Sequence, residues 1–183
     1  MRANHAKHRL LGSIREIVFG LEDSLVSTLG TITGIAAGTQ STYIVLLSGL
    51  VLIAVEATSM SAGSYLSSKS AAEAEREIAK EEGKDAVIET TPLRAAIVMG
   101  IFYFLGGFVP LAPYFFLPVA AAVWPSVAAT VVILFLVGVW SAKVTKRSVW
   151  KGGVEMVVVS IGAAILGYLI GRIAHQQFGV QAV

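Results

Sequence analysis

Stretches of about twenty mostly apolar residues dominate the sequence, and each is long enough to cross the ~30 Å hydrocarbon layer of a membrane as a helix. Five such segments occur in the 183 residues, at about 17–38, 43–66, 93–113, 119–141 and 153–173. A backbone that crosses lipid must satisfy its own hydrogen bonds, so each segment is predicted to be helical. Only 14% of the residues are charged, against about 25% in soluble domains. The sequence therefore predicts an all-α integral membrane protein with five transmembrane helices in a single domain, residues 1–183.

Lysine and arginine are distributed unequally between the two sides of these spans. All of them except Arg172 lie in the N-terminal segment, between the second and third spans or at the border of the third (Arg94), or after the fourth span. Because cytoplasmic loops are enriched in Lys and Arg, we expect a cytoplasmic N-terminus and a C-terminus outside. No signal-peptide cleavage pattern precedes the first span, so a cleaved leader is not expected. There is no cysteine, which excludes disulfides and thiolate ligands.

Residues 67–91 form the one long hydrophilic segment. Its first part is rich in Ala, Glu, Lys and Arg, which favour helices. We therefore expect the second span to continue as a short acidic cytoplasmic helix to about Glu82, ending at Gly83. Thr91 followed by Pro92 is typical of a helix start, because proline is tolerated at the first helical position.

The cytoplasmic helix carries a stripe of acidic residues. Glu73, Glu77 and Glu81 are spaced four residues apart, so they lie on one helical face and are candidates for cytoplasmic metal capture. Lys80 and Lys84 alternate with them, which favours the alternative that this is a solvated helix face. Both interpretations are kept.

Acidic residues also occur within the predicted spans, where a carboxylate costs at least ~3 kcal/mol on insertion scales. Glu22 and Asp23 lie in the first span, Glu56 lies near the middle of the second, and Glu155 lies near the cytoplasmic end of the fifth. An unpaired acid in a low-dielectric site takes up a proton or binds a cation. Adjacent residues point about 100° apart on a helix, so one of the first two faces the path, and we favour Asp23. Glu155 has an alternative role in an ion pair with Lys151.

Two methionines accompany these acids. Met60 lies one turn after Glu56 on the same helical face, and Met156 follows Glu155. A thioether makes a carboxylate site softer and favours Fe²⁺ or a similar ion over Ca²⁺. The alternative is that Met60 contacts lipid or fills the core. The candidate metal ligands are Asp23, Glu56, Met60, Glu22, Glu155 and Met156.

Glycines at Gly30, Gly34 and Gly38 recur on one face of the first span, which predicts close approach of another helix. No glycine-rich phosphate-binding loop and no Ser–His–Asp set is present. We therefore expect neither an ATP-driven transporter nor an enzyme, and no cofactor or nucleic-acid partner.

Several segments are similar to one family of membrane proteins. They are GLEDSLVSTLGTITGIAAG in the first span, EATSMSAGSYLSSKSAAEAE in the second, GGFVPLAPYF in the third and KGGVEMVVVSIGAAILGYLIG in the fifth. In these the sequence resembles the vacuolar iron transporter family. The resemblance implies a five-helix protomer, a homodimer with the path near its two-fold axis, and proton-coupled export of Fe²⁺. It puts Asp23 and Met60 on the family's metal path and gives Glu155 and Met156 a matching context.

The sequence departs from that family in two places. Plant and fungal members have a long cytoplasmic metal-binding domain between the second and third spans, where only residues 67–91 remain here. The family's second-span acid also lies further from the methionine than Glu56 does, so Glu56 is a substitute or has another role.

The resulting interpretation is proton-coupled transport of a divalent transition metal, Fe²⁺ or Mn²⁺, out of the cytoplasm, with Asp23 and Glu56 alternating between metal and protons. The alternatives are a passive divalent-metal channel, or a membrane scaffold or partner subunit without transport. The expected location is a prokaryotic cell (inner) membrane, or the vacuolar membrane in a eukaryote.

Overall fold

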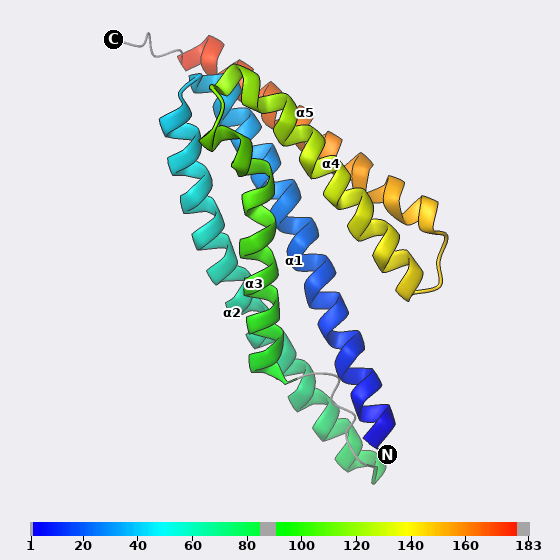
Figure 1. Cartoon of the computed structure of the whole chain (residues 1–183). Coiled ribbons are helices and arrows are strands. Elements are labelled where there is room, and N and C mark those ends of the chain that lie inside the picture. The colour runs from blue at the N-terminus through cyan, green and yellow to red at the C-terminus, as the bar shows by residue number, and fades with distance from the viewer. Residues whose placement is uncertain (1, 85–90, 179–183) are drawn as a thin grey trace.

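A computed structural model describes residues 2–84 and 91–178, with side chains from residue 13 onward. Its elements are helices: α1 (Arg2–Thr39), α2 (Thr42–Glu82), α3 (Pro92–Leu111), the short 3₁₀ helix η1 (Ala112–Phe115), α4 (Val119–Val144) and α5 (Val149–Phe178) (Figure 1). α1, α2 and α3 lie side by side, and α4 and α5 form a hairpin whose turn lies away from the N-terminal end of α1.

Four segments of the described chain are long and apolar enough to span a membrane: α2, α3 with η1, α4 and α5. The chain is an integral membrane protein. α1 is not among the four, because Glu22 and Asp23 interrupt its apolar stretch. It is nevertheless the helix that contacts all the others, most extensively α5 and α3, and Leu25 and Leu29 are fully buried. The prediction of five spans is thus confirmed for four helices, and the remaining one lies at the centre of the bundle.

The ends of α2 and the start of α3 follow local sequence signals. The Ser41 hydroxyl accepts a hydrogen bond from the Ile44 N–H, which caps the start of α2. Gly83 ends α2 with a φ of 63°, a left-handed conformation that glycine adopts without a Cβ penalty. α3 begins at Pro92 directly after Thr91. The predicted continuation of α2 to Glu82 and the predicted start of α3 are confirmed.

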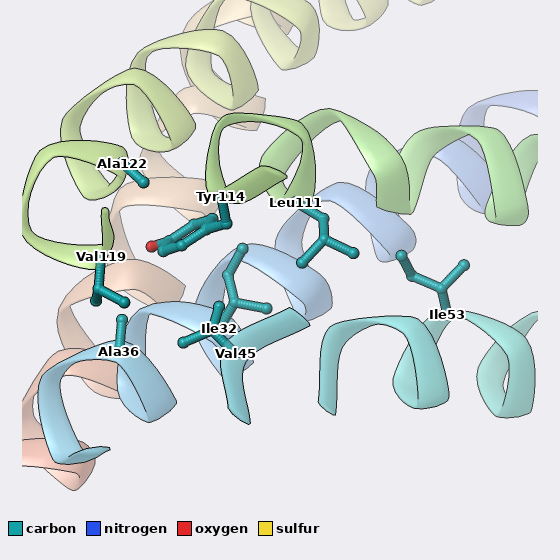
Figure 2. Close-up of a cluster of buried hydrophobic side chains, with 8 residues drawn as sticks. All are labelled: Ile32, Ala36, Val45, Ile53, Leu111, Tyr114, Val119 and Ala122. Atoms are coloured by element: carbon teal, nitrogen blue, oxygen red, sulfur yellow. The ribbon is translucent and has the colours of Figure 1, made fainter. Parts of the chain in front are cut away.

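A hydrophobic core closes the end of the bundle where α1 meets α2 and η1 meets α4. Its buried members are Ile32, Ala36, Val45, Ile53, Leu111, Tyr114, Val119 and Ala122 (Figure 2). Nearby, the Ser126 hydroxyl of α4 donates a hydrogen bond of 2.6 Å to the Pro110 carbonyl of α3. These contacts hold α3 and α4 together across the chain reversal at η1.

α1 packs on α5 through glycines. A Cβ added to Gly34 would lie 2.7 Å from the Gly167 carbonyl oxygen. A Cβ added to Gly167 or Gly171 would collide with the carbonyl oxygens of Gly30 and Gly34. The glycine repeat of the first span therefore does allow a second helix backbone to approach closely, as predicted, and that helix is α5.

Candidate functional site

Two of the candidate acids come together from different helices. Asp23 of α1 and Glu56 of α2 lie close enough for their charges to interact, and both side chains are partly buried. α1 and α2 run antiparallel, and a hydrogen bond between Glu16 and Ser64 joins them two turns before Asp23. Counting two turns along both helices from that contact leads to Asp23 on α1 and to the turn that contains Glu56 on α2. Asp23 and Glu56 therefore lie at the same level of the α1–α2 pair, within electrostatic reach of each other.

α3 adds a phenol to this pair. Tyr103 is fully buried, its hydroxyl lies 2.9 Å from the Ser27 Oγ, and it is within electrostatic reach of Asp23 and Glu56. Neither Tyr103 nor Ser27 was singled out from the sequence. Two signals point to them: Ser27 lies one turn after Asp23, and a buried tyrosine hydroxyl in an apolar helix needs a partner. We call Asp23, Glu56, Tyr103 and Ser27 the carboxylate cluster.

Glu22 is also partly buried and interacts with the charge of Asp23. The charge of Glu56 on α2 influences Asp23, whereas Glu22 is influenced by Asp23. This geometry favours Asp23 over its neighbour as the residue that faces α2.

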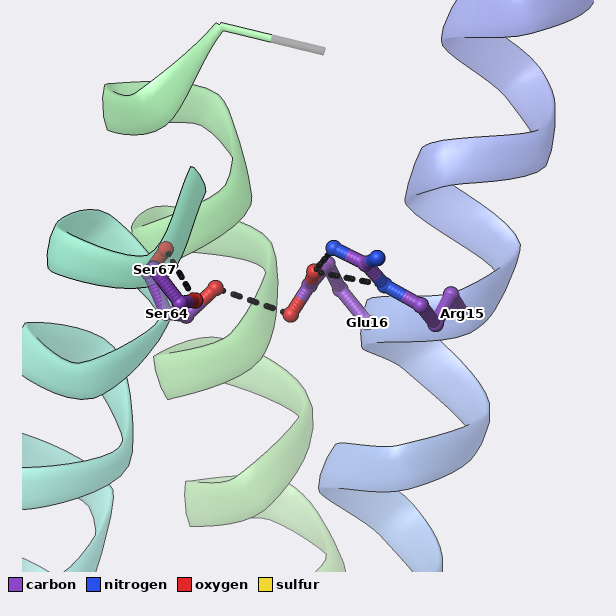
Figure 3. Close-up of polar contacts among 4 residues, drawn as sticks. All are labelled: Arg15, Glu16, Ser64 and Ser67. Atoms are coloured by element: carbon purple, nitrogen blue, oxygen red, sulfur yellow. Dashed lines mark hydrogen bonds and ion pairs between the residues drawn. The ribbon is translucent and has the colours of Figure 1, made fainter. Parts of the chain in front are cut away.

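Met60 lies one turn after Glu56 on α2, as expected, and it also lies near a carboxylate that was not singled out from the sequence. It lines a cavity of about 420 Å³ together with Glu16 and Met99, on the side of the carboxylate cluster nearer the N-terminus of α1. Glu16 is only 3% exposed, and its carboxylate accepts a hydrogen bond of 2.8 Å from the Ser64 hydroxyl and forms an ion pair of 2.8 Å with Arg15 (Figure 3). Glu16 was missed because it precedes the predicted span, although it lies seven residues, two turns, before Asp23 on the same face.

Glu155 lies on the α4–α5 hairpin and not among α1, α2 and α3. Its side chain is 60% exposed and pairs with Arg147 of the α4–α5 turn at 3.2 Å. The sequence offered an ion pair with Lys151 as the alternative role of Glu155, and the structure shows an ion pair with Arg147. Met156 is partly buried beside it. The structure does not join these two residues to the carboxylate cluster.

The three acids of the hydrophilic helix that are candidates for metal capture are exposed. Glu77 pairs with Lys80 at 2.6 Å, and Glu73 lies 3.9 Å from Lys69. Glu81 is also exposed. These contacts favour the solvated-face interpretation over metal capture.

Within residues 2–84 and 91–178, no group of three or more His, Asp or Glu side chains is placed to hold a metal ion. A metal at the carboxylate cluster would therefore be held by two carboxylates with neutral oxygen donors, such as the Ser27 and Tyr103 hydroxyls or water. Two carboxylates match the charge of one divalent cation, and oxygen donors suit Mg²⁺, Mn²⁺ and Fe²⁺.

Comparison with known proteins places the chain in a family. The model of the VIT family matches residues 14–87 and 77–172, which together cover most of the chain. The chain belongs to the VIT family. The two matched parts overlap at residues 77–87. These residues lie within the hydrophilic segment 67–91, between the second and third predicted spans.

Named relatives of this VIT-family chain come from archaea and plants. It is 28% identical to an uncharacterized protein of Methanocaldococcus jannaschii, over 86% of this chain and 88% of that protein. It is 26% identical to vacuolar iron transporter 1 of Arabidopsis thaliana, over 92% of this chain and 89% of that protein. It is 32% identical to vacuolar iron transporter homolog 4 of the same plant, over 79% and 75%. The match to vacuolar iron transporter 1 runs over 223 positions, more than the 183 residues of this chain, so the plant protein carries residues within the match that are lacking here.

Proposed function

We propose that this VIT-family chain transports a divalent transition metal out of the cytoplasm in exchange for protons, with Fe²⁺ as the first candidate and Mn²⁺ as the second. The observation that carries the proposal is the approach of Asp23 and Glu56 from two helices inside a bundle of membrane-spanning helices. The names of the plant relatives, which are vacuolar iron transporters, support the metal.

The mechanism follows from charge. Two neighbouring, partly buried carboxylates repel each other, and either a divalent cation or protons relieve the repulsion. Metal binds while both carboxylates are ionised, and protonation releases it because a neutral carboxyl is a poor ligand. The hydroxyls of Tyr103 and Ser27, 2.9 Å apart, offer neutral oxygen atoms beside the pair. In this mechanism the acids exchange one divalent ion for protons in each cycle.

The proposal includes an orientation and an assembly. The basic segments at the N-terminus of α1 and at the α4–α5 turn face the cytoplasm, following the distribution of Lys and Arg. The functional unit is a homodimer with the path near its two-fold axis, as the family resemblance implies. The archaeal relative supports a prokaryotic cell membrane as the location.

The test is Fe²⁺ uptake into proteoliposomes that contain a pH-sensitive dye. We expect wild-type protein to move Fe²⁺ with an opposing proton signal, and Asp23→Asn and Glu56→Gln to lose both signals. Glu82→Gln is the matched control, because Glu82 is an exposed acid at the end of α2 that pairs with Lys84, and it should transport like wild type. Metal movement without a proton signal would identify a passive channel. If wild-type protein moves no divalent metal, the transport proposal is wrong and a scaffold role becomes the better interpretation.

A further inference from the structure

The 420 Å³ cavity lies between the carboxylate cluster and the end of the bundle that carries the N-terminus. Its walls come from three helices: Arg15, Glu16 and Phe19 of α1, Met60, Gly63, Ser64 and Ser67 of α2, and Met99 of α3. Glu16 lies about 10 Å along α1 from Asp23, at 1.5 Å per residue over seven residues. An ion that moves from this end of the bundle to the carboxylate cluster would therefore pass the Glu16 carboxylate.

The charge of Glu16 is balanced by a side chain that is largely exposed to the outside of the bundle. Burying a carboxylate is unfavourable unless it is paired and hydrogen-bonded. Ser64 supplies a neutral donor from inside the bundle, and Arg15 supplies the positive charge. The Arg15 side chain is 62% exposed, whereas that of Glu16 is 4% exposed, so the guanidinium reaches inward from the surface. A cation that enters the cavity can replace it on the carboxylate without exposing Glu16.

The other donors around the cavity suit a transition metal. Met60 and Met99 line the same cavity as Glu16, Ser64 and Ser67, so its lining residues include two thioethers, a carboxylate and two hydroxyl groups. Met99 is 3% exposed, and its sulfur packs against α1, where a Cβ on Gly20 would lie 3.3 Å from it. A carboxylate combined with thioethers favours softer divalent ions over Mg²⁺ and Ca²⁺.

We propose that this cavity is a second metal site, in which the transported ion is first bound by Glu16, Met60 and Met99 in exchange for the Arg15 guanidinium before it reaches Asp23 and Glu56. The inference rests on the proposed function for the direction of travel. It assigns a binding role to Glu16 and Met99, and it makes Arg15 a competitor of the metal.

The experiment measures binding of Co²⁺, an air-stable substitute for Fe²⁺, to the full chain in detergent micelles by calorimetry. The background is the double variant Asp23→Asn/Glu56→Gln, which removes the carboxylates of the cluster. We expect this background to retain one Co²⁺ site per chain. Adding Glu16→Gln should weaken that site at least about tenfold, as loss of metal-site residues does elsewhere. Adding Arg15→Gln should instead tighten it, because the competing charge is gone.

The opposite effects of these two variants separate a metal site from a structural ion pair. If the ion pair between Arg15 and Glu16 has only a structural role, both variants lower the unfolding temperature and neither changes the affinity for Co²⁺. That result would overturn the proposal. Met99→Leu keeps the volume of the side chain and removes the sulfur, so it should weaken Co²⁺ binding more than Mg²⁺ binding. Equal loss for both ions, or no loss, would contradict the thioether contacts.

Binding and transport fail in different ways. If the protein exports Fe²⁺ but shows no Co²⁺ site that depends on Glu16, the proposed function stands and the proposal of a second site is wrong. If the protein binds Co²⁺ at Glu16 but moves no metal in proteoliposomes, the second site stands and the proposed function is wrong.

Discussion

Replacement of Gly34 by alanine is expected to force α1 away from α5. The added Cβ would lie 2.7 Å from the Gly167 carbonyl oxygen and 3.2 Å from its carbon. Both atoms belong to the backbone, so no side-chain rotation relieves the clash. Ordinary contact begins at about 3.4 Å, so the two helices must separate locally by about 0.7 Å. Close packing makes such a displacement costly, because neighbouring contacts along the α1–α5 interface are stretched with it.

The magnitude is obtained by comparison with a glycine that has free space. Gly162 lies on α5, and a Cβ placed there meets nothing within 4 Å. Alanine in place of glycine favours the helix by up to about 1 kcal/mol at both positions, so this contribution cancels. Overpacking adds about 1–3 kcal/mol of destabilisation at Gly34 alone. Gly34→Ala should therefore be about 1–3 kcal/mol less stable than Gly162→Ala.

The free energies of unfolding can be measured by titrating each purified variant with SDS in mixed micelles and following helix content by circular dichroism. Gly162→Ala should be as stable as wild type or slightly more stable, and Gly34→Ala should unfold at a lower SDS fraction. Variants within about 0.5 kcal/mol of each other, the usual range for substitutions without structural contacts, would refute the close approach of α1 and α5.

Two further substitutions test the core and the site. Ser126→Ala should lower the free energy of unfolding by about 1 kcal/mol in the same SDS titration, because the buried Pro110 carbonyl loses its 2.6 Å hydrogen bond; an unchanged value would contradict this role. Tyr103→Phe should weaken the apparent affinity for Fe²⁺ in proteoliposomes about tenfold, because the hydroxyl that contacts Ser27 beside the carboxylates is lost. Tyr168→Phe, on the exposed surface of α5, is the control, and equal behaviour of the two tyrosine variants would show that the phenol is not involved.

Much of the helical framework is predictable from the sequence because its signals are local. Apolar length marks α2, α3, α4 and α5, and the end of α2 at Glu82 follows from helix-forming residues that stop at Gly83. The glycine repeat predicts a close helix neighbour for α1 without saying which helix it is. The identity of that neighbour depends on packing over the whole bundle, and the structure supplies it as α5.

The partners of the charged residues are harder to predict because they depend on turns and on distant helices. Helical spacing favours Lys151 as the partner of Glu155, four residues away. The chain instead reverses before α5, with Lys146 at a left-handed φ of 56°, and this turn brings Arg147 to Glu155 across eight positions. In the same way, Tyr103 reaches Ser27 across 76 positions, a contact that no spacing rule reveals.

The different faces of α1 explain how a helix with buried acids can remain inside a membrane protein. Glu16, Asp23 and Ser27 face α2 and α3, which provide Ser64, Glu56 and Tyr103 as neighbours. Gly30, Gly34 and Gly38 of α1 meet α5 backbone to backbone. Because lipid offers no partner to a carboxylate, such a helix is stable only where other helices cover its polar face. The side towards α5 is held by close backbone packing at Gly30, Gly34 and Gly38. The side towards α2 and α3 combines apolar contacts, such as those of Ile32 with the core, with a few polar contacts that are each worth about 1 kcal/mol.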